Sequence, residues 1–158
     1  MDTLSDVAVA DKFYKSFAQR DIEAMLTCYS ENVTFEDPAF GKLEGTNAHN
    51  MWRMLLKQGD ADLAISHTTP EVRGQTIITQ WEAKYKFSKT GRQVDNMITA
   101  KMIIKDGKII DHKDAFDIWK WSRMALGITG LLLGFTPIVK NKIRSQALKA
   151  LRKFESQQ

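Results

Sequence analysis

Hydrophobic residues recur at helical spacing in the first third of the chain. Between residues 4 and 19 they fall three or four positions apart with charged residues between them, which predicts an amphipathic helix. A second, short helix is predicted after Asp21, whose carboxylate can cap its first turn. A third is predicted after Thr46, which can also act as a cap, and Gly59 is a natural C-terminal stop for it.

Beyond this third helix the hydrophobic period changes from about 3.6 to 2 and stays there for about fifty residues. Residues 76–87 and 93–105 alternate apolar with polar side chains, and the turn sequence SKTGR between them predicts a hairpin. A second hairpin is predicted at Asp106-Gly107, a strong turn pair. Three helices followed by strands joined by tight turns predict an α+β fold, with the helices packed on one face of a curved antiparallel sheet.

A carboxylate lies on an otherwise apolar strand face before the third helix. Val33, Phe35 and Asp37 point the same way in an extended strand, which Pro38 ends because it cannot donate to a ladder. An acid on such a face either costs free energy for its burial or has a chemical role. Asp37 is therefore a candidate catalytic residue. The alternative is that it only accepts backbone hydrogen bonds from the loop at Gly41.

The last predicted strand carries a histidine and a second acid. Ile110, His112, Asp114 and Phe116 alternate onto one face. A buried acid and a histidine can exchange protons near neutral pH, so His112 and Asp114 are the natural catalytic partners of Asp37. They are equally well explained as a structural pair that satisfies itself, and a slip of one residue in register would turn both outward.

Composition limits the chemistry further. The chain has 158 residues, 43% hydrophobic and 27% charged, as expected for a single globular domain. Cys28 is the only cysteine, so an internal disulfide is excluded. His49, His67 and His112 lack ligand spacing, and we expect neither a metal nor a cofactor. The acidic, polar opening MDTLSDVAVAD predicts no signal peptide and a cytoplasmic location.

The last forty residues return to helical character and carry the positive charge. From Ile118 onward there are eight Lys or Arg residues and one acid, Glu155, so a basic tail follows a mildly acidic body. Sixteen uncharged residues between Arg123 and Lys140 include three glycines and a proline, which is too short and too broken to span a bilayer. Residues 141–154 predict an amphipathic basic helix.

Three motifs in order are familiar: FYKSFAQRD, NVTFEDPAFGKLEGT and DGKIIDHKDAFD. Over roughly residues 5–120 the chain resembles the nuclear transport factor 2-like superfamily. Ketosteroid isomerases, SnoaL-like polyketide cyclases and limonene epoxide hydrolases share its cone-shaped α+β fold. The resemblance implies a cone domain over residues 1–120 and a helical extension over 121–158 that packs on the domain or on a partner subunit. It also implies a homodimer, because sheets in this superfamily commonly pair.

The resemblance implies a role for Asp37 in particular. The run Glu36-Asp37-Pro38 stands where ketosteroid isomerases carry the aspartate that moves the proton. The position of their oxyanion-hole tyrosine falls on Phe13, with Tyr14 beside it, and that of their protonated aspartate falls near Ala100. Because an enolate would lack these donors, steroid isomerase activity itself is not expected. SnoaL-like cyclases carry an acid/base aspartate on a late strand, as Asp114 is placed here.

These observations predict a pocket for a small apolar, polycyclic or isoprenoid-like molecule and a cofactor-free isomerase, cyclase or hydratase/hydrolase. The predicted ligand-binding residues from the resemblance and the inward faces are Phe13, Tyr14, Trp52, His67, Trp81, Tyr85, Asn96, Ala100 and Trp119. The leading alternative is a non-catalytic ligand-binding or protein-association module whose cone is filled by its own side chains, such as Phe13, Trp52 or Trp81.

The tail has three interpretations. Its apolar stretch can pack on the open face of the sheet or on a second subunit. It can also form a lid over the mouth of the cone, because glycines allow an apolar helix to move. Third, the neighbouring basic helix can bring the protein into peripheral contact with an anionic membrane or lipid. Nucleic acid is not expected as a partner, because the tail lacks interleaved aromatics and the body is acidic.

Overall fold

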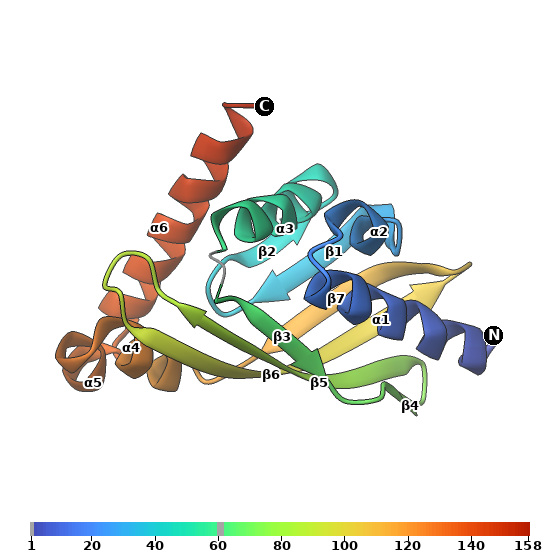
Figure 1. The fold of residues 1–158 in the computed structure, drawn as a ribbon, viewed down its shortest axis with the longest axis horizontal. Coiled ribbons are helices and arrows are strands. Elements are labelled where there is room, and N and C mark those ends of the chain that lie inside the picture. Colours follow the sequence, from blue (N-terminus) through green and yellow to red (C-terminus); the bar gives the residue numbers. More distant parts are fainter. Residues whose placement is uncertain (1, 60–61) are drawn as a thin grey trace.

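The protein folds as helices over one face of a curved, open sheet, as the sequence predicts (Figure 1). The computed structural model describes residues 2–59 and 62–158. The helices are α1 (Thr3–Ala18), α2 (Ile22–Leu26), α3 (Thr46–Gln58), α4 (Ile118–Leu126), α5 (Ile128–Leu133) and α6 (Pro137–Glu155). The strands are β1 (Tyr29–Asp37), β2 (Gly41–Glu44), β3 (Ala64–His67), β4 (Glu71–Arg73), β5 (Thr76–Lys86), β6 (Gln93–Lys105) and β7 (Lys108–Ala115).

The strands follow the order β2-β1-β7-β6-β5-β3, with β4 also paired to β5. All pairs are antiparallel except β1 with β7, which run parallel and place Phe35 beside His112. The predicted loop at Gly41 is instead the start of strand β2, which returns against β1 with Gly41 opposite Asp37. Because β1 and β7 lie far apart in the sequence, their pairing brings two predicted catalytic segments together.

The inward faces of β5 and β6 follow the predicted alternation. On β6 every second residue from Val94 to Ile104 is buried. On β7 the prediction for Ile110 is wrong, because the register against β6 shifts there and Ile104 pairs with Ile109. Ile109 is therefore buried and Ile110 is exposed, while His112 still faces inward. The shift re-aims one side chain without reversing the rest of the strand.

The turns and caps show which local predictions hold. Asp106 and Gly107 both have positive φ, of 52° and 73°, as a two-residue hairpin requires. The Asp21 carboxylate accepts a hydrogen bond from the Ala24 N–H, which confirms it as the cap of α2. The predicted capping role of Thr46 is wrong: Thr46 is the first residue of α3, and Gly45, with φ of 53°, precedes it. A positive φ at that position favours glycine.

The C-terminal helices pack at the end of the sheet and beside α3. The Thr90 hydroxyl and the Arg92 side chain, in the turn between β5 and β6, donate to the last carbonyls of α4. Helix α6 runs alongside α3 and buries Leu151 and Phe154 (Figure 1). Among the helices described, none is long and apolar enough to cross a membrane.

Candidate functional site

A chain of hydrogen bonds runs through the core between α3, β1, β7 and β5. The Trp52 indole N–H donates to the Tyr29 hydroxyl (2.8 Å), which lies 2.7 Å from Nδ1 of His112. The other ring nitrogen of His112, Nε2, lies 2.8 Å from Oδ1 of Asp114. The Trp81 indole N–H donates to the same carboxylate oxygen, at 3.3 Å. Two of the predicted catalytic residues are thus directly bonded to each other.

One arrangement of protons satisfies every group in this chain. Because the Tyr29 hydroxyl already accepts from Trp52, it can donate its own hydrogen to Nδ1 of His112. The imidazole then carries its hydrogen on Nε2 and donates to Asp114, which also accepts from Trp81. In this arrangement each N–H and O–H donor of the chain has an acceptor, and Asp114 accepts two hydrogen bonds.

His112 and Asp114 are shielded from solvent. The His112 side chain has no exposed surface, and that of Asp114 is 3% exposed. A substrate outside this packed interior cannot reach the imidazole directly. Their hydrogen bond to each other is compatible with both alternatives that the sequence leaves open, a catalytic pair and a structural pair.

Asp37 is more exposed than His112 and Asp114, and its pKa is higher than that of an ordinary aspartate. It is the last residue of β1 and directly follows Glu36, which lies beside Lys113 of β7 in the parallel register. Its Oδ1 accepts a 2.6 Å hydrogen bond from the Phe40 N–H. Burial raises the pKa of Asp37 to about 7; the Phe40 N–H opposes this, and the Asp114 charge adds to it. Near neutral pH, Asp37 can therefore either accept or release a proton.

Two further residues complete what we call the rim cluster, defined as Asp37, Tyr85 and Trp121. The Trp121 indole N–H on α4 donates to the Tyr85 hydroxyl (2.8 Å), which keeps its own hydrogen to donate. Burial raises the pKa of Tyr85, with the Trp121 hydrogen bond opposing and the nearby charge of Asp37 adding to the rise. All three are half-buried. The rim cluster combines a carboxyl whose pKa is about 7 with a hydroxyl that can donate a hydrogen bond.

Aromatic side chains fill the interior of the fold. Phe13, Trp52 and Trp81 are all buried. Their rings pack against one another, with centroids of Phe13 and Trp52 5.7 Å apart and of Trp52 and Trp81 6.3 Å apart. Two surface depressions of the described chain contain none of the predicted site residues; they are lined by Asp2, Ser5, Asp6, Ile104, Lys105, Asp106 and Gly107, and by Glu31, Asn32, Thr46, His49 and Arg53.

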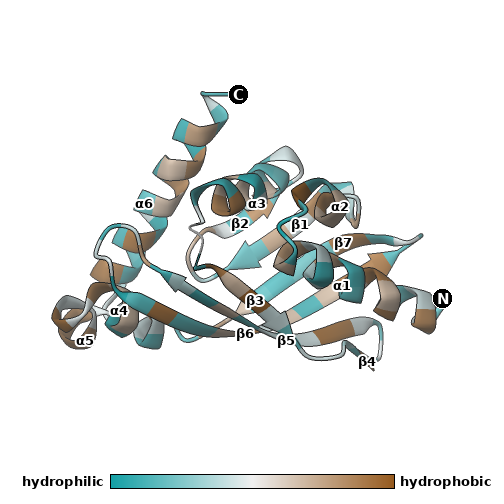
Figure 2. Ribbon diagram, viewed as in Figure 1, coloured by the Kyte–Doolittle hydropathy of each residue, from teal (hydrophilic) through white to brown (hydrophobic). Residues whose placement is uncertain are grey.

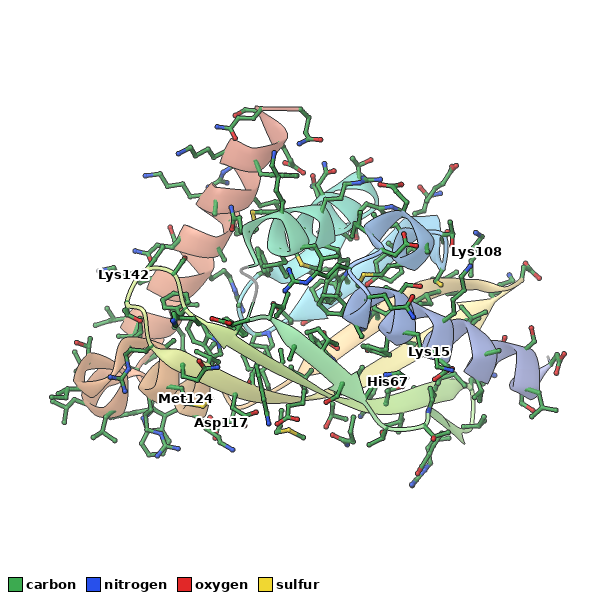
Figure 3. All side chains as sticks on the ribbon, viewed as in Figure 1. Lys15, His67, Lys108, Asp117, Met124 and Lys142 are labelled. Atoms are coloured by element: carbon green, nitrogen blue, oxygen red, sulfur yellow. The ribbon has the colours of Figure 1, made fainter. Side chains whose placement is uncertain are left out.

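The remaining predicted residues lie in three places. Nε2 of His67 lies 2.8 Å from Oδ1 of Asp11, on the same helix α1 as Lys15 (Figure 3). This hydrogen bond gives the imidazole a structural partner. Asn96 and Ala100 are buried on the inward face of β6. Ala100, the position that the resemblance indicated for an aspartate, pairs with Asp114, so the Asp114 carboxyl lies on the neighbouring strand β7. Trp119 donates from its indole to the Leu131 carbonyl and contacts α5, away from the rim cluster.

Family comparison agrees with this architecture. Residues 10–112, more than half of the chain, match the SnoaL-like domain family. The chain belongs to the SnoaL-like family. A comparison with curated proteins gives no match for it.

Solved structures place this SnoaL-like protein in the nuclear transport factor 2-like fold. It superposes on an NTF2-like protein of unknown function from Burkholderia pseudomallei with a TM-score of 0.65 at 15% identity, covering 77% of this chain and 97% of that one. An LEH-like epoxide hydrolase from M. tuberculosis superposes with a TM-score of 0.62 at 12% identity, covering 82% of this chain and 96% of that one. SalBIII, an epoxide hydrolase/cyclase-like enzyme of pyran ring formation in salinomycin, superposes with a TM-score of 0.64 at 14% identity, covering 74% of this chain and 94% of that one.

The SnoaL-like core contains a buried hydroxyl without a partner among the described residues, that of Tyr14. Burial raises the pKa of Tyr14 well above its usual value, and the charge of Asp114 adds to the rise. We expect Tyr14→Phe to raise the free energy of unfolding by about 1 kcal/mol, because it removes an unsatisfied polar group. Tyr29→Phe is the matched control and should lower it by about 1–3 kcal/mol, since Trp52 and His112 lose a partner. Urea denaturation measures both, and a loss in Tyr14→Phe would contradict the assignment.

Sequence reasoning missed Tyr29 and Trp121. Tyr29 falls on the apolar spacing of the short second helix and reads as an ordinary core residue, although it begins β1 and bonds to His112. Trp121 lies two residues after Trp119, about 200° around α4, and faces Tyr85 instead of α5. Helical spacing distinguishes the two tryptophans, but it does not tell which of them faces the sheet.

Proposed function

We propose that this protein is a cofactor-free acid–base enzyme that acts on a small apolar molecule at the rim cluster. The observation that carries the proposal is the half-buried Asp37 carboxyl with a pKa of about 7, whose charge acts on the Tyr85 hydroxyl, a hydrogen-bond donor. A general base works best when its pKa lies near the working pH.

In this proposal Asp37 removes a proton from carbon or from water, and Tyr85 donates a hydrogen bond to the substrate oxygen that gains negative charge. Asp37 then returns the proton, so no net proton is needed for an isomerisation, a cyclisation or a hydration. Asp114 acts at a distance: its charge, held by His112 and Trp81, helps to keep the Asp37 pKa high. Epoxide hydrolase-like and cyclase-like enzymes among the structural neighbours support this reaction class.

The filled interior restricts where such a molecule can bind. Because Phe13, Trp52 and Trp81 occupy the interior of the fold, the substrate in this proposal binds at the rim cluster, against Tyr85 and Trp121. Helix α4 supplies Trp121 and therefore forms part of the wall in this proposal. A larger, polycyclic substrate requires these aromatic side chains to rearrange.

A thermal-shift titration against epoxides, cyclic ketones, sterol-like and isoprenoid compounds tests the proposal. A compound that binds only the native state at about 100 times its dissociation constant stabilises it by about 2.7 kcal/mol. We expect one class to raise the midpoint of the wild type and to be turned over, with turnover lost in Asp37→Asn. Glu36→Gln, at the exposed neighbouring acid, is the matched control and should keep full activity.

The filled interior also favours a second candidate, a non-catalytic association module. In that case the aromatic core and the Tyr29–His112–Asp114 chain serve stability alone. The same titration decides between the two. If no compound class raises the midpoint and none is turned over, the enzyme proposal fails and the association module replaces it.

A further inference from the structure

Helix α5 buries its small residue and exposes its large apolar side chains. Its buried residue is Gly130, which lies so close to α4 that an added Cβ would meet the Ser122 carbonyl oxygen at 1.9 Å. Its large side chains face outward, and Ile128 and Leu132 are 76% and 63% exposed. Together with residues just after the helix they form what we call the apolar patch: Ile128, Leu131, Leu132, Leu133, Phe135 and Ile138 (Figure 2). So many exposed apolar side chains in one segment mark an interaction surface.

The apolar patch is held in a fixed shape. The indole N–H of Trp119 donates to the Leu131 carbonyl at 3.3 Å, and its ring packs edge-to-face against Phe135. The Thr136 hydroxyl accepts from the Val139 N–H, and Pro137 occupies the first turn of α6, which fixes the start of that helix. The surface therefore needs little ordering before it binds a partner.

Cations lie on the two helices that flank α5 in the sequence. Lys120 and Arg123 lie on α4, with the Arg123 guanidinium 4.6 Å from the Trp119 ring centroid, and Lys140 and Lys142 lie in the first turns of α6. Figure 3 shows Met124 and Lys142 at the end of the molecule opposite Lys108. The acids of this part of the chain are Asp117, which caps α4, and Glu155, in the last turn of α6. The apolar patch is therefore flanked by segments that carry four cations, Lys120, Arg123, Lys140 and Lys142, against the one nearby acid Asp117.

We propose that the apolar patch docks on the surface of an anionic lipid bilayer. Apolar side chains enter the boundary between headgroups and acyl chains, while lysine and arginine side chains meet the anionic headgroups. A tryptophan at the edge of the patch suits this boundary because its ring is apolar and its N–H is polar. A second copy of the chain fits less well, since a twofold interface brings the same surfaces together and would set these cations against each other.

Co-sedimentation of the full chain with vesicles tests the proposal. We expect the wild type to pellet with vesicles of equal parts phosphatidylserine and phosphatidylcholine, to remain in solution with phosphatidylcholine alone, and to be released by salt. Ile128→Ser/Leu132→Ser should weaken binding by more than about tenfold, since both exposed apolar side chains are lost. Lys140→Glu/Lys142→Glu should abolish it.

Matched controls separate the patch from general charge and hydrophobicity. Leu4→Ser removes an apolar side chain that is 81% exposed on α1, and it should pellet like the wild type. Lys101→Glu/Lys105→Glu makes the same charge change on β6 and should retain most of the binding. Absence of wild-type binding to anionic vesicles overturns the proposal. So does a wild-type dimer in analytical ultracentrifugation that Ile128→Ser/Leu132→Ser dissociates, because the second copy then covers the patch.

Discussion

Replacing Asp37 with asparagine is expected to raise the free energy of unfolding at about pH 8 by roughly 2–4 kcal/mol. In the folded protein burial raises the Asp37 pKa to about 7, whereas the unfolded chain has a pKa near the ordinary 3.8. At this pH the native state must therefore hold an ionised carboxylate in a site that disfavours it. Asparagine keeps an oxygen that can accept from the Phe40 N–H and removes the charge.

The same substitution should change how stability depends on pH. Below about pH 3 Asp37 is mostly protonated in both the folded and the unfolded chain and costs almost nothing. As the pH rises toward about 7 the unfolded chain releases this proton while the native state retains it, so the contribution of Asp37 to stability falls; above about 7 it is constant. Urea denaturation across this range should show the fall in the wild type and in Glu36→Gln, but not in Asp37→Asn.

A loss of stability in Asp37→Asn at about pH 8 would contradict this prediction. It would mean that the carboxylate is favoured by the hydrogen bond from Phe40 and serves as a structural acceptor. The stabilised variant, in contrast, is the expected behaviour of a functional group kept at a cost to folding, since activity and stability often trade against each other.

Trp52→Ala is expected to lower the free energy of unfolding by about 3–5 kcal/mol. Trp52 is fully buried, its ring packs on Phe35, Phe17 and His112, and its N–H donates to Tyr29. Truncation therefore removes apolar contacts, leaves a cavity and leaves the Tyr29 hydroxyl with one partner fewer. Urea denaturation measures the loss.

Trp52→Phe is the matched variant, because it keeps most of the ring and removes the N–H. It should cost about 1 kcal/mol through the lost hydrogen bond, together with a smaller cavity than alanine leaves. A loss below about 1 kcal/mol in Trp52→Ala would show that the aromatic interior is loosely packed, contrary to the structure.

Local patterns predicted the parts of the fold that local chemistry determines. Alternation identified the buried face of β6 from Val94 to Ile104, and the Asp106-Gly107 pair identified its turn. Alternation could not place the register shift at Ile110, because the shift depends on how β7 matches its neighbour. Thr46 is a good cap by residue type, yet Gly45 supplies the backbone angles that the start of α3 needs.

The candidate site depends on pairings that sequence spacing does not reveal. The parallel pairing of β1 with β7 sets Phe35 beside His112 and Glu36 beside Lys113, and a predicted antiparallel sheet gave no reason to expect it. The spacing around Tyr29 is that of an ordinary core residue, and its hydrogen bond to His112 depends on the fold. The outward direction of α5 was also hidden, because an apolar segment ordinarily predicts burial and the glycines decide which side packs.

The pKa of the Asp37 carboxyl is the quantity on which the proposed chemistry depends, and carbon-13 NMR of its side-chain carboxyl, titrated with pH, measures it. We expect a midpoint of about 7 in the wild type. In Asp114→Asn we expect a lower midpoint, because the neighbouring charge is gone while burial still holds it above the ordinary value. A wild-type midpoint near the ordinary 3.8 would mean that Asp37 is fully ionised at neutral pH, and the acid–base role would then be wrong.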